Sequence, residues 1–222
     1  MIKRIEIPSS DKKLNSTLDQ EYWNSKWQGN QIGWDIGYAS PAICAYMDQY
    51  PNKEAQILIA GCGNAHEAVY LLEHNFKHIT LIDFAPEAIK RVKAKFADQT
   101  AVNVLCTDFF EHEGQYELLL EQTFFCAIAP ERRAEYVQKV SSLLRPNGRM
   151  VGVLFDQLLD EPGPPFGGDL MIYQQLFTPN FILQTMEKCY NSIKPRIGKE
   201  VFINFLKRED VNSNELSGFS SI

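Results

Sequence analysis

The chain has 222 residues, of which 45% are hydrophobic and 23% charged, and its formal net charge is −6. This length suits one sizeable core, and the composition excludes a disordered chain, which has too few apolar side chains to bury. An acidic chain lacks the broad basic field of nucleic-acid binders, so we expect a small-molecule substrate or a protein as partner and no nucleic acid.

The first 50 residues follow no regular pattern and contain all three tryptophans of the chain, Trp23, Trp27 and Trp34. Large aromatic side chains suit either a lid over a ligand or simple core packing. Ser40 followed by Pro41 predicts the start of a helix over 41–49. The serine hydroxyl can accept from a free backbone N–H there, and proline fits the first helical turn.

From residue 56 onward, short β-rich runs alternate with helical stretches, which predicts parallel βαβ units with right-handed crossovers. Prolines mark the start of two helices, at Pro86 and Pro130. The turn-forming residues 145–149 should close the second of these helices. The expected strands are 56–60, 78–82, 102–106, 116–121, 149–155 and 200–207.

The last part of the chain contains a loop rich in proline and glycine over 157–169, and we expect a helix over 179–187 after it. We expect a single domain over 1–222. Its parts would be an aromatic N-terminal arm or lid over 1–50, a Rossmann-like core over 51–208 and a flexible tail over 209–222.

The sequence GCG places Gly61 and Gly63 between an expected strand and an expected helix. Glycine at such a turn lets backbone N–H groups approach a ligand closely. Asp83 ends the next strand, where it can accept hydrogen bonds from a ribose. Dinucleotide-binding proteins have a third glycine where this chain has His66. This difference argues against a turn that binds the pyrophosphate of a dinucleotide. The pattern indicates an adenosine-containing cofactor, with an ordinary tight turn as the alternative.

A second acidic residue, Asp108, follows the third expected strand in the sequence TDFF. It could reach the amino group of an adenine while Phe109 contacts the ring face. An ordinary turn residue is the alternative reading of Asp108.

Together, the GCG turn, Asp83, TDFF and the segment YELLLEQTFFCAIAPERRAEYVQKVSSLLRPNGRMVGVLF resemble class I S-adenosylmethionine-dependent methyltransferases. The closer resemblance is to the thiopurine S-methyltransferase family and its plant-type halide and thiol methyltransferase branch, whose aromatic lead-in YWNSKWQGNQIGWDIGYASP matches. It covers residues 20–207. The resemblance implies an α/β, doubly wound Rossmann-like fold with a seven-stranded, mostly parallel sheet and an antiparallel last strand.

The resemblance also implies S-adenosyl-L-methionine as cofactor, and it carries over a set of site residues. The implied cofactor-binding residues are Trp23, Trp27, Trp34, Gly61, Gly63, Asp83, Asp108, Phe109, Glu121 and Gln122. The implied acceptor residues are Gln122, Arg132 or Arg133, and Phe166, and an exposed helix charge is the alternative reading of either arginine. The pair Glu121-Gln122 departs from the Asp-Tyr and Asp-Arg pairs of the two branches, which leaves the acceptor open.

The function implied is methyl transfer to a small soft nucleophile, namely a thiol, sulfide, halide or heteroaryl thiol, by direct in-line displacement. We expect no dedicated catalytic residue, since proximity, orientation and a dry cavity suffice when the leaving group is neutral. One alternative is a cofactor-binding module without turnover. Another is a nicotinamide-dependent oxidoreductase, against which the missing third glycine counts.

The five cysteines are odd in number and widely spaced, and the histidines show no metal-binding pattern, so we expect reduced, buried cysteines without disulfides, and no metal. Cys62 lacks a histidine placed as its partner, which disfavours covalent catalysis. No run approaches the roughly 18 apolar residues of a membrane helix, and the N-terminus lacks a signal-like apolar core. We therefore expect a cytoplasmic protein, and a monomer because no feature indicates an interface.

Overall fold

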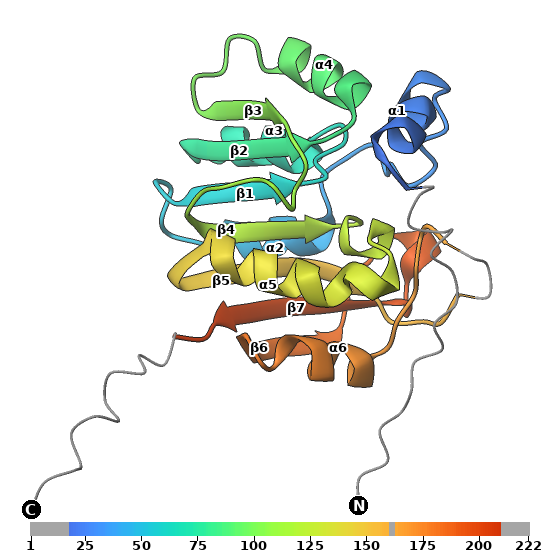
Figure 1. The fold of residues 1–222 in the computed structure, drawn as a ribbon. Coiled ribbons are helices and arrows are strands. Elements are labelled where there is room, and N and C mark those ends of the chain that lie inside the picture. Colours follow the sequence, from blue (N-terminus) through green and yellow to red (C-terminus); the bar gives the residue numbers. More distant parts are fainter. Residues whose placement is uncertain (1–17, 160–162, 210–222) are drawn as a thin grey trace, which may run out of the picture.

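The computed structural model describes residues 18–159 and 163–209, and these form one seven-stranded sheet in the order β3-β2-β1-β4-β5-β7-β6 (Figure 1). Strands β1 to β5 pair in parallel, whereas β7 runs antiparallel to both of its neighbours. The predicted α/β fold with its antiparallel last strand is therefore confirmed. The strands are β1 (Gln56–Ala60), β2 (His78–Asp83), β3 (Val102–Cys106), β4 (Tyr116–Gln122), β5 (Leu144–Phe155), β6 (Phe181–Lys188) and β7 (Glu200–Lys207).

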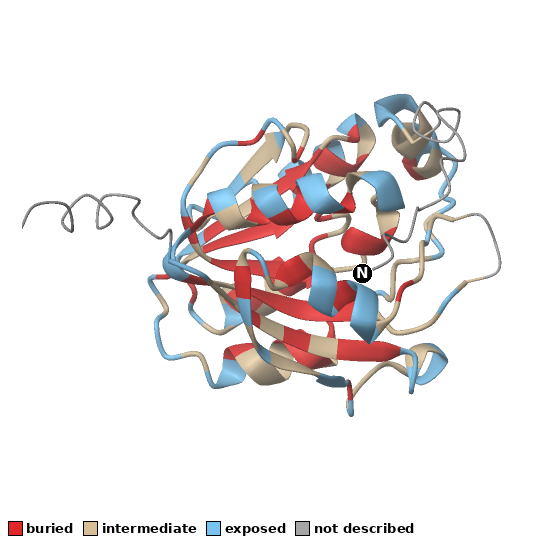
Figure 2. Cartoon of the chain, turned by 60° about the horizontal axis from the view of Figure 1, so that its bottom comes forward, coloured by how far each residue is buried: buried red, intermediate tan, exposed pale blue. Residues whose placement is uncertain are grey.

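Helices cover both faces of the sheet, because successive strand residues point to opposite faces and both faces are apolar. On one face Ile57 and Ile59 share a buried cluster with residues of α2, α3 and α4, and on the other Leu58 and Ala60 pack with α5 and α6. Figure 2 shows that burial is concentrated in the strands and on the sheet-facing sides of the helices. The helices are α1 (Gln20–Gln28), α2 (Pro41–Asp48), α3 (His66–Glu73), α4 (Pro86–Lys95), α5 (Arg133–Leu143) and α6 (Leu170–Phe177). The described residues also contain the short 3₁₀ turns η1 (Phe125–Ala127), η2 (Pro130–Arg132) and η3 (Lys194–Arg196).

The prediction of a helix over 179–187 is wrong, since Phe181–Lys188 is strand β6 and the helix, α6, comes before it. Asp169 starts α6, where its side chain accepts a hydrogen bond of 2.9 Å from the N–H of Ile172. Residues such as Leu183 and Met186 favour helices, but pairing along β7 overrides that preference.

Two features of the N-terminal segment differ from the sequence expectation, namely the capping of α2 and the presence of α1. Helix α2 begins at Pro41 as predicted, but the Ser40 hydroxyl makes no capping bond and the Ser40 N–H instead donates to Glu67 at 3.0 Å. The first 50 residues also contain an unpredicted helix, α1. Its cap is Asp19, which accepts from the N–H of Tyr22 at 2.9 Å.

The expected turn at 145–149 is part of strand β5 rather than a separate connection. Leu144 pairs with Tyr116 and Arg149 with Leu118, so the residues between them form a distortion in the strand register. Asn147 takes a left-handed conformation there, with φ of 63°. Turn residues can thus be absorbed within a strand as an irregularity when the neighbouring strand continues.

The remaining expectations concern the thiols, the membrane and the chain ends. All five cysteines are free, and three are buried, but Cys106 is exposed, contrary to the expectation of burial. Among the described residues no helix is long and apolar enough to cross a membrane. Nor do the described residues gather three or more metal-ligating side chains. The predicted tail, beyond residue 209, and residues 1–17 of the predicted arm lie outside the described residues.

Candidate functional site

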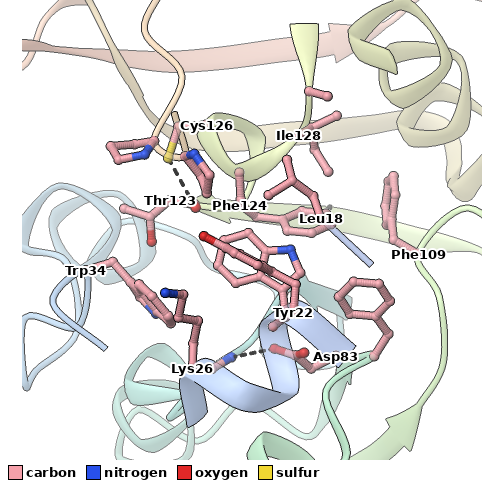
Figure 3. Close-up of a pocket in the computed structure, with 18 of the residues that line it drawn as sticks. Leu18, Tyr22, Lys26, Trp34, Asp83, Phe109, Thr123, Phe124, Cys126 and Ile128 are labelled. Carbon is pink, nitrogen blue, oxygen red and sulfur yellow. Dashed lines mark hydrogen bonds between the residues drawn. The ribbon is translucent and has the colours of Figure 1, made fainter. Parts of the chain in front are cut away.

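A cavity of about 520 Å³ opens at the carboxyl ends of β1, β2 and β4, where it is covered by α1 (Figure 3). Strands β2 and β3 extend the sheet on one side of β1, and β4 and β5 extend it on the other side. The strand order therefore reverses between β1 and β4. Ligands of doubly wound sheets bind at this kind of reversal, and the volume is typical of sites for small molecules and cofactors.

The glycine turn forms the floor of this cavity. Gly61 and Gly63 both have left-handed backbones, with φ of 58° and 52°. A Cβ on Gly61 would collide with the ring of Phe124, which follows β4. Glycine is therefore required at position 61 both by backbone conformation and by the close approach of an aromatic ring.

Asp83 lies at the end of β2, and its buried carboxylate lines the cavity. Burial raises the pKa of this carboxyl, against hydrogen bonds from the N–H groups of Ala85 at 2.9 Å and Gly63 at 3.3 Å. A carboxylate has about four acceptor positions, so Asp83 can hold the glycine turn and still accept from a ligand hydroxyl. This arrangement fits a ribose diol beside the glycine turn.

Asp108 and Phe109 also line the cavity, after β3. The Asp108 carboxylate accepts from the N–H of Phe110 at 2.9 Å, which holds the turn in shape. Phe109 is only 4% exposed and packs edge-on against Phe124, with 5.2 Å between ring centroids. Phe110, which the sequence reasoning did not select, lines the cavity with the guanidinium carbon of Arg132 3.6 Å from its ring centroid.

The three tryptophans form one cluster over the cavity. Trp34 packs edge-on against both others, with ring centroids 5.5 Å from Trp23 and 5.9 Å from Trp27. The helix that carries Trp23 and Trp27 is fastened to α4, since Arg91 donates to the Trp27 carbonyl at 2.8 Å and Asn24 accepts from the N–H of Glu87 at 2.8 Å. These contacts place the tryptophans beside the glycine turn.

Glu121 and Gln122 do not reach the cavity, which is lined at this point by Thr123, Phe124 and Cys126. The Glu121 carboxylate is buried and accepts from the N–H groups of Phe124 and Phe125, both at 2.8 Å, and from the Tyr136 hydroxyl at 2.6 Å. Burial raises its pKa to about 7, against these three hydrogen bonds. The Gln122 side-chain oxygen is buried without a hydrogen-bond partner among the described residues.

The loop that contains Phe166 borders the cavity through Pro164 and Pro165, while Phe166 itself is not part of the lining. The Phe166 N–H donates to the Cys126 carbonyl at 2.6 Å. Arg133, at the start of α5, donates to the carbonyls of Gly167 at 2.9 Å and Phe166 at 3.1 Å. Arg133 thus holds the loop in place, and its neighbour Arg132 is the arginine that lines the cavity.

The sequence reasoning missed Arg196, which lines the cavity from the other end of the chain. Its guanidinium donates to the Trp34 carbonyl at 3.1 Å, and a second nitrogen lies 3.4 Å from the Glu200 carboxylate. The guanidinium carbon is 5.5 Å from the Phe155 ring centroid. No spacing rule relates Arg196 to residues 162 positions away, so only the fold identifies it.

Comparison with known proteins matches residues 18–211 to the family model described as Thiopurine S-methyltransferase. A probable thiol methyltransferase 2 of Arabidopsis thaliana is 26% identical over 172 residues, covering 75% of this chain and 76% of the relative. A thiocyanate methyltransferase 1 of the same plant is 24% identical, with 84% and 85% covered. A thiopurine S-methyltransferase of Vibrio parahaemolyticus is 29% identical, with 72% and 82% covered.

Solved structures share the fold. A 1,6-didemethyltoxoflavin-N1-methyltransferase of Burkholderia thailandensis with bound S-adenosylhomocysteine superposes with a TM-score of 0.70 at 17% identity, covering 93% of this chain and 94% of that one. A magnesium protoporphyrin IX methyltransferase of Synechocystis with S-adenosylhomocysteine gives 0.68 at 12% identity, with 87% and 100% covered.

The cavity of this chain combines a glycine turn, a buried carboxylate after β2 and a second acidic turn after β3. The chain therefore belongs to the thiopurine S-methyltransferase family and is an S-adenosylmethionine-dependent methyltransferase.

Proposed function

We propose that this methyltransferase acts on a small soft nucleophile, namely a thiol, sulfide, halide or heteroaryl thiol, by direct in-line displacement. The observation that carries the proposal is Arg196, a largely enclosed guanidinium that faces the cavity beside Phe155. Glu200 engages one side of the guanidinium, but its remaining N–H groups can donate hydrogen bonds to an anionic acceptor, which a protonated amine cannot accept. The names of the plant and bacterial relatives, thiol, thiocyanate and thiopurine methyltransferases, agree with this preference.

The order of the strands separates two ends of the cavity. Asp83 and Asp108 follow β2 and β3 and would hold the ribose and the adenine. Phe155 and Arg196 lie at the ends of β5 and η3, on the other half of the sheet, and would receive the acceptor. The glycine turn after β1 lies between them, where it would hold the amino-acid portion of the cofactor.

When bound, S-adenosylmethionine supplies a methyl group on a positively charged sulfonium whose departure leaves a neutral sulfide. The protein then has to exclude water and align the acceptor, which is the main source of rate when no further activation is needed. We propose that the aromatic segment over 18–40 acts as the lid for this purpose, with the tryptophan faces toward the cation. The whole chain would act as one methyltransferase domain and as a monomer.

The test is a turnover assay of the purified protein with S-adenosylmethionine and a panel of acceptors. The panel contains iodide, thiocyanate, hydrosulfide, a small alkyl thiol and a heteroaryl thiol, with a primary amine and an alcohol as hard-nucleophile controls. We expect S-adenosylhomocysteine and the methylated product only with soft acceptors. Turnover with the amine or alcohol alone would refute the proposal, and cofactor binding without any turnover would favour a binding module.

A further inference from the structure

A second, water-sized cavity lies directly behind the wall of the main one. Its volume is about 10 Å³, and Thr123, Cys126 and Phe155 line both cavities. A site for one buried water needs roughly 10–15 Å³ and two to four polar partners. Three of the residues that line the small cavity, Glu121, Thr123 and Glu200, carry oxygen atoms in their side chains that could serve as such partners. Figure 3 shows Thr123 and Cys126 together at the wall of the main cavity.

The two carboxylates at the small cavity differ in their surroundings. Glu200 is paired with Arg196 at 3.4 Å, whereas among the described residues no cation lies within ion-pair distance of Glu121. Glu121 accepts three hydrogen bonds, which leaves one of its roughly four acceptor positions for a water molecule. A buried carboxylate without a cationic partner gains a proton more readily than one held in an ion pair.

The groups around Glu121 support a proton acceptor at neutral pH. Burial raises its pKa to about 7, which is near the value expected of a base that works at that pH. The facing titratable groups are Tyr136 from α5, Cys126 from η1 and Glu200 from β7, and the guanidiniums of Arg133 and Arg196 act on Cys126. Burial raises the pKa values of Tyr136 and Cys126, so both stay protonated when Glu121 is ionised.

We propose, on the basis of the function proposed above, that Glu121 takes up the proton of a neutral thiol acceptor through the Thr123 hydroxyl and one water in the small cavity. The acceptor sulfur gives its proton to this chain, and the proton arrives at the Glu121 carboxylate. The freed sulfur lone pair forms the bond to the methyl carbon, and the old carbon–sulfur bond breaks with its electron pair left on the departing sulfide. Glu121 later returns the proton to solvent.

The need for such a route follows from thiol chemistry. The thiolate is the nucleophile, and an ordinary thiol with a pKa of about 8.5 is mostly protonated at neutral pH. Iodide and thiocyanate carry no proton at that pH. The route therefore matters for thiol acceptors and not for iodide or thiocyanate. The rates with the two kinds of acceptor can be compared in the same protein.

The decisive variant is Glu121→Gln, because glutamine can keep all three hydrogen bonds. Its oxygen can accept from the two backbone N–H groups, and its amide can donate to the Tyr136 oxygen. We measure kcat for an alkyl thiol and for iodide near neutral pH. The thiol-to-iodide ratio should fall at least about 10-fold in Glu121→Gln and in Thr123→Val. Glu200→Gln should lower this ratio less than either of them.

A ratio unchanged in Glu121→Gln, or lowered more in Glu200→Gln, would overturn the proposal. A second readout does not depend on turnover. A heteroaryl thiol bound to the complex with S-adenosylhomocysteine should show the thiolate absorbance in the wild type, and less of it in Glu121→Gln at the same pH. Equal absorbance in both would also overturn the proposal. Failure of the proposed function is distinct, since the wild type would then methylate neither acceptor.

Discussion

Replacing Glu121 by glutamine removes a buried charge and keeps the shape of the side chain and its hydrogen bonds. The folded protein holds this carboxyl at a pKa of about 7, against an ordinary value of 4.5. A raised pKa means that folding favours the protonated form. The stabilising contribution is complete below the unfolded value and is lost as the pH rises through about 7. Wild-type stability should therefore fall relative to Glu121→Gln as the pH increases.

The size of the effect follows from the two pKa values. A shift of this size corresponds to a free-energy cost of about 3 kcal/mol for the fully ionised group, at about 1.4 kcal/mol per pKa unit. Of this cost, about 2 kcal/mol is added between about pH 5.5 and about pH 8.5, as a loss of wild-type unfolding free energy relative to Glu121→Gln. Other titrating groups are present in both proteins and cancel in the difference.

The assay is urea unfolding of the wild type and Glu121→Gln at both pH values, with the difference in unfolding free energy compared. Glu113→Gln is the control, because Glu113 is exposed and its charge is already in water in the folded protein. The difference should grow in favour of Glu121→Gln by about 2 kcal/mol toward high pH and stay nearly constant for Glu113→Gln. A difference that is independent of pH would refute the reasoning.

Four further outcomes are expected. Asp83→Ala should weaken S-adenosylmethionine binding roughly 100-fold in calorimetry, since the two charge-assisted hydrogen bonds that we propose to the ribose would be lost, and unchanged affinity would remove Asp83 from the site. Arg196→Met should raise KM for thiocyanate about 10-fold with a smaller change in Arg196→Lys, and equal effects would contradict a planar guanidinium contact. Asp169→Ala should cost about 1 kcal/mol of unfolding free energy through loss of the α6 cap, to be compared with Asp169→Asn, which keeps the cap. Because all three tryptophans line the cavity, S-adenosylhomocysteine but not NAD should change the tryptophan emission on titration.

The fold was largely predictable because its central strands are short apolar runs separated by marked helix starts. The runs at 56–60 and 78–82 appear in the structure as β1 and β2, and the glycine turn lies between them as expected. The last third was harder. Strand β6 is rich in residues that favour helices, and it becomes a strand because the edge of β7 is available for pairing.

The candidate site was predictable where it depends on the turns after successive strands, because the carboxyl ends of parallel strands meet at one edge. Asp83 and Asp108 line the cavity for that reason. The sequence did not predict, however, which way a side chain points at the end of a strand. Glu121 points into the core between β4 and α5, where its carboxylate accepts hydrogen bonds from the Tyr136 hydroxyl and two backbone N–H groups. Arg196 reaches the cavity through contacts that only the folded chain creates.

The fastening of the aromatic segment has a consequence for how the acceptor range of this enzyme can change. Besides the Asn24 side chain, three of its attachments use main-chain carbonyl oxygens: those of Trp27, Trp34 and Phe84 accept hydrogen bonds from Arg91, Arg196 and Gln20 at 2.8, 3.1 and 2.7 Å. Every amino acid carries such an oxygen, so substituting the indole side chains leaves these attachments available. The tryptophan side chains that cover the cavity can therefore be changed by mutation while the hydrogen bonds that attach the segment remain. These tryptophan positions are thus suited to altering substrate choice by selection or design.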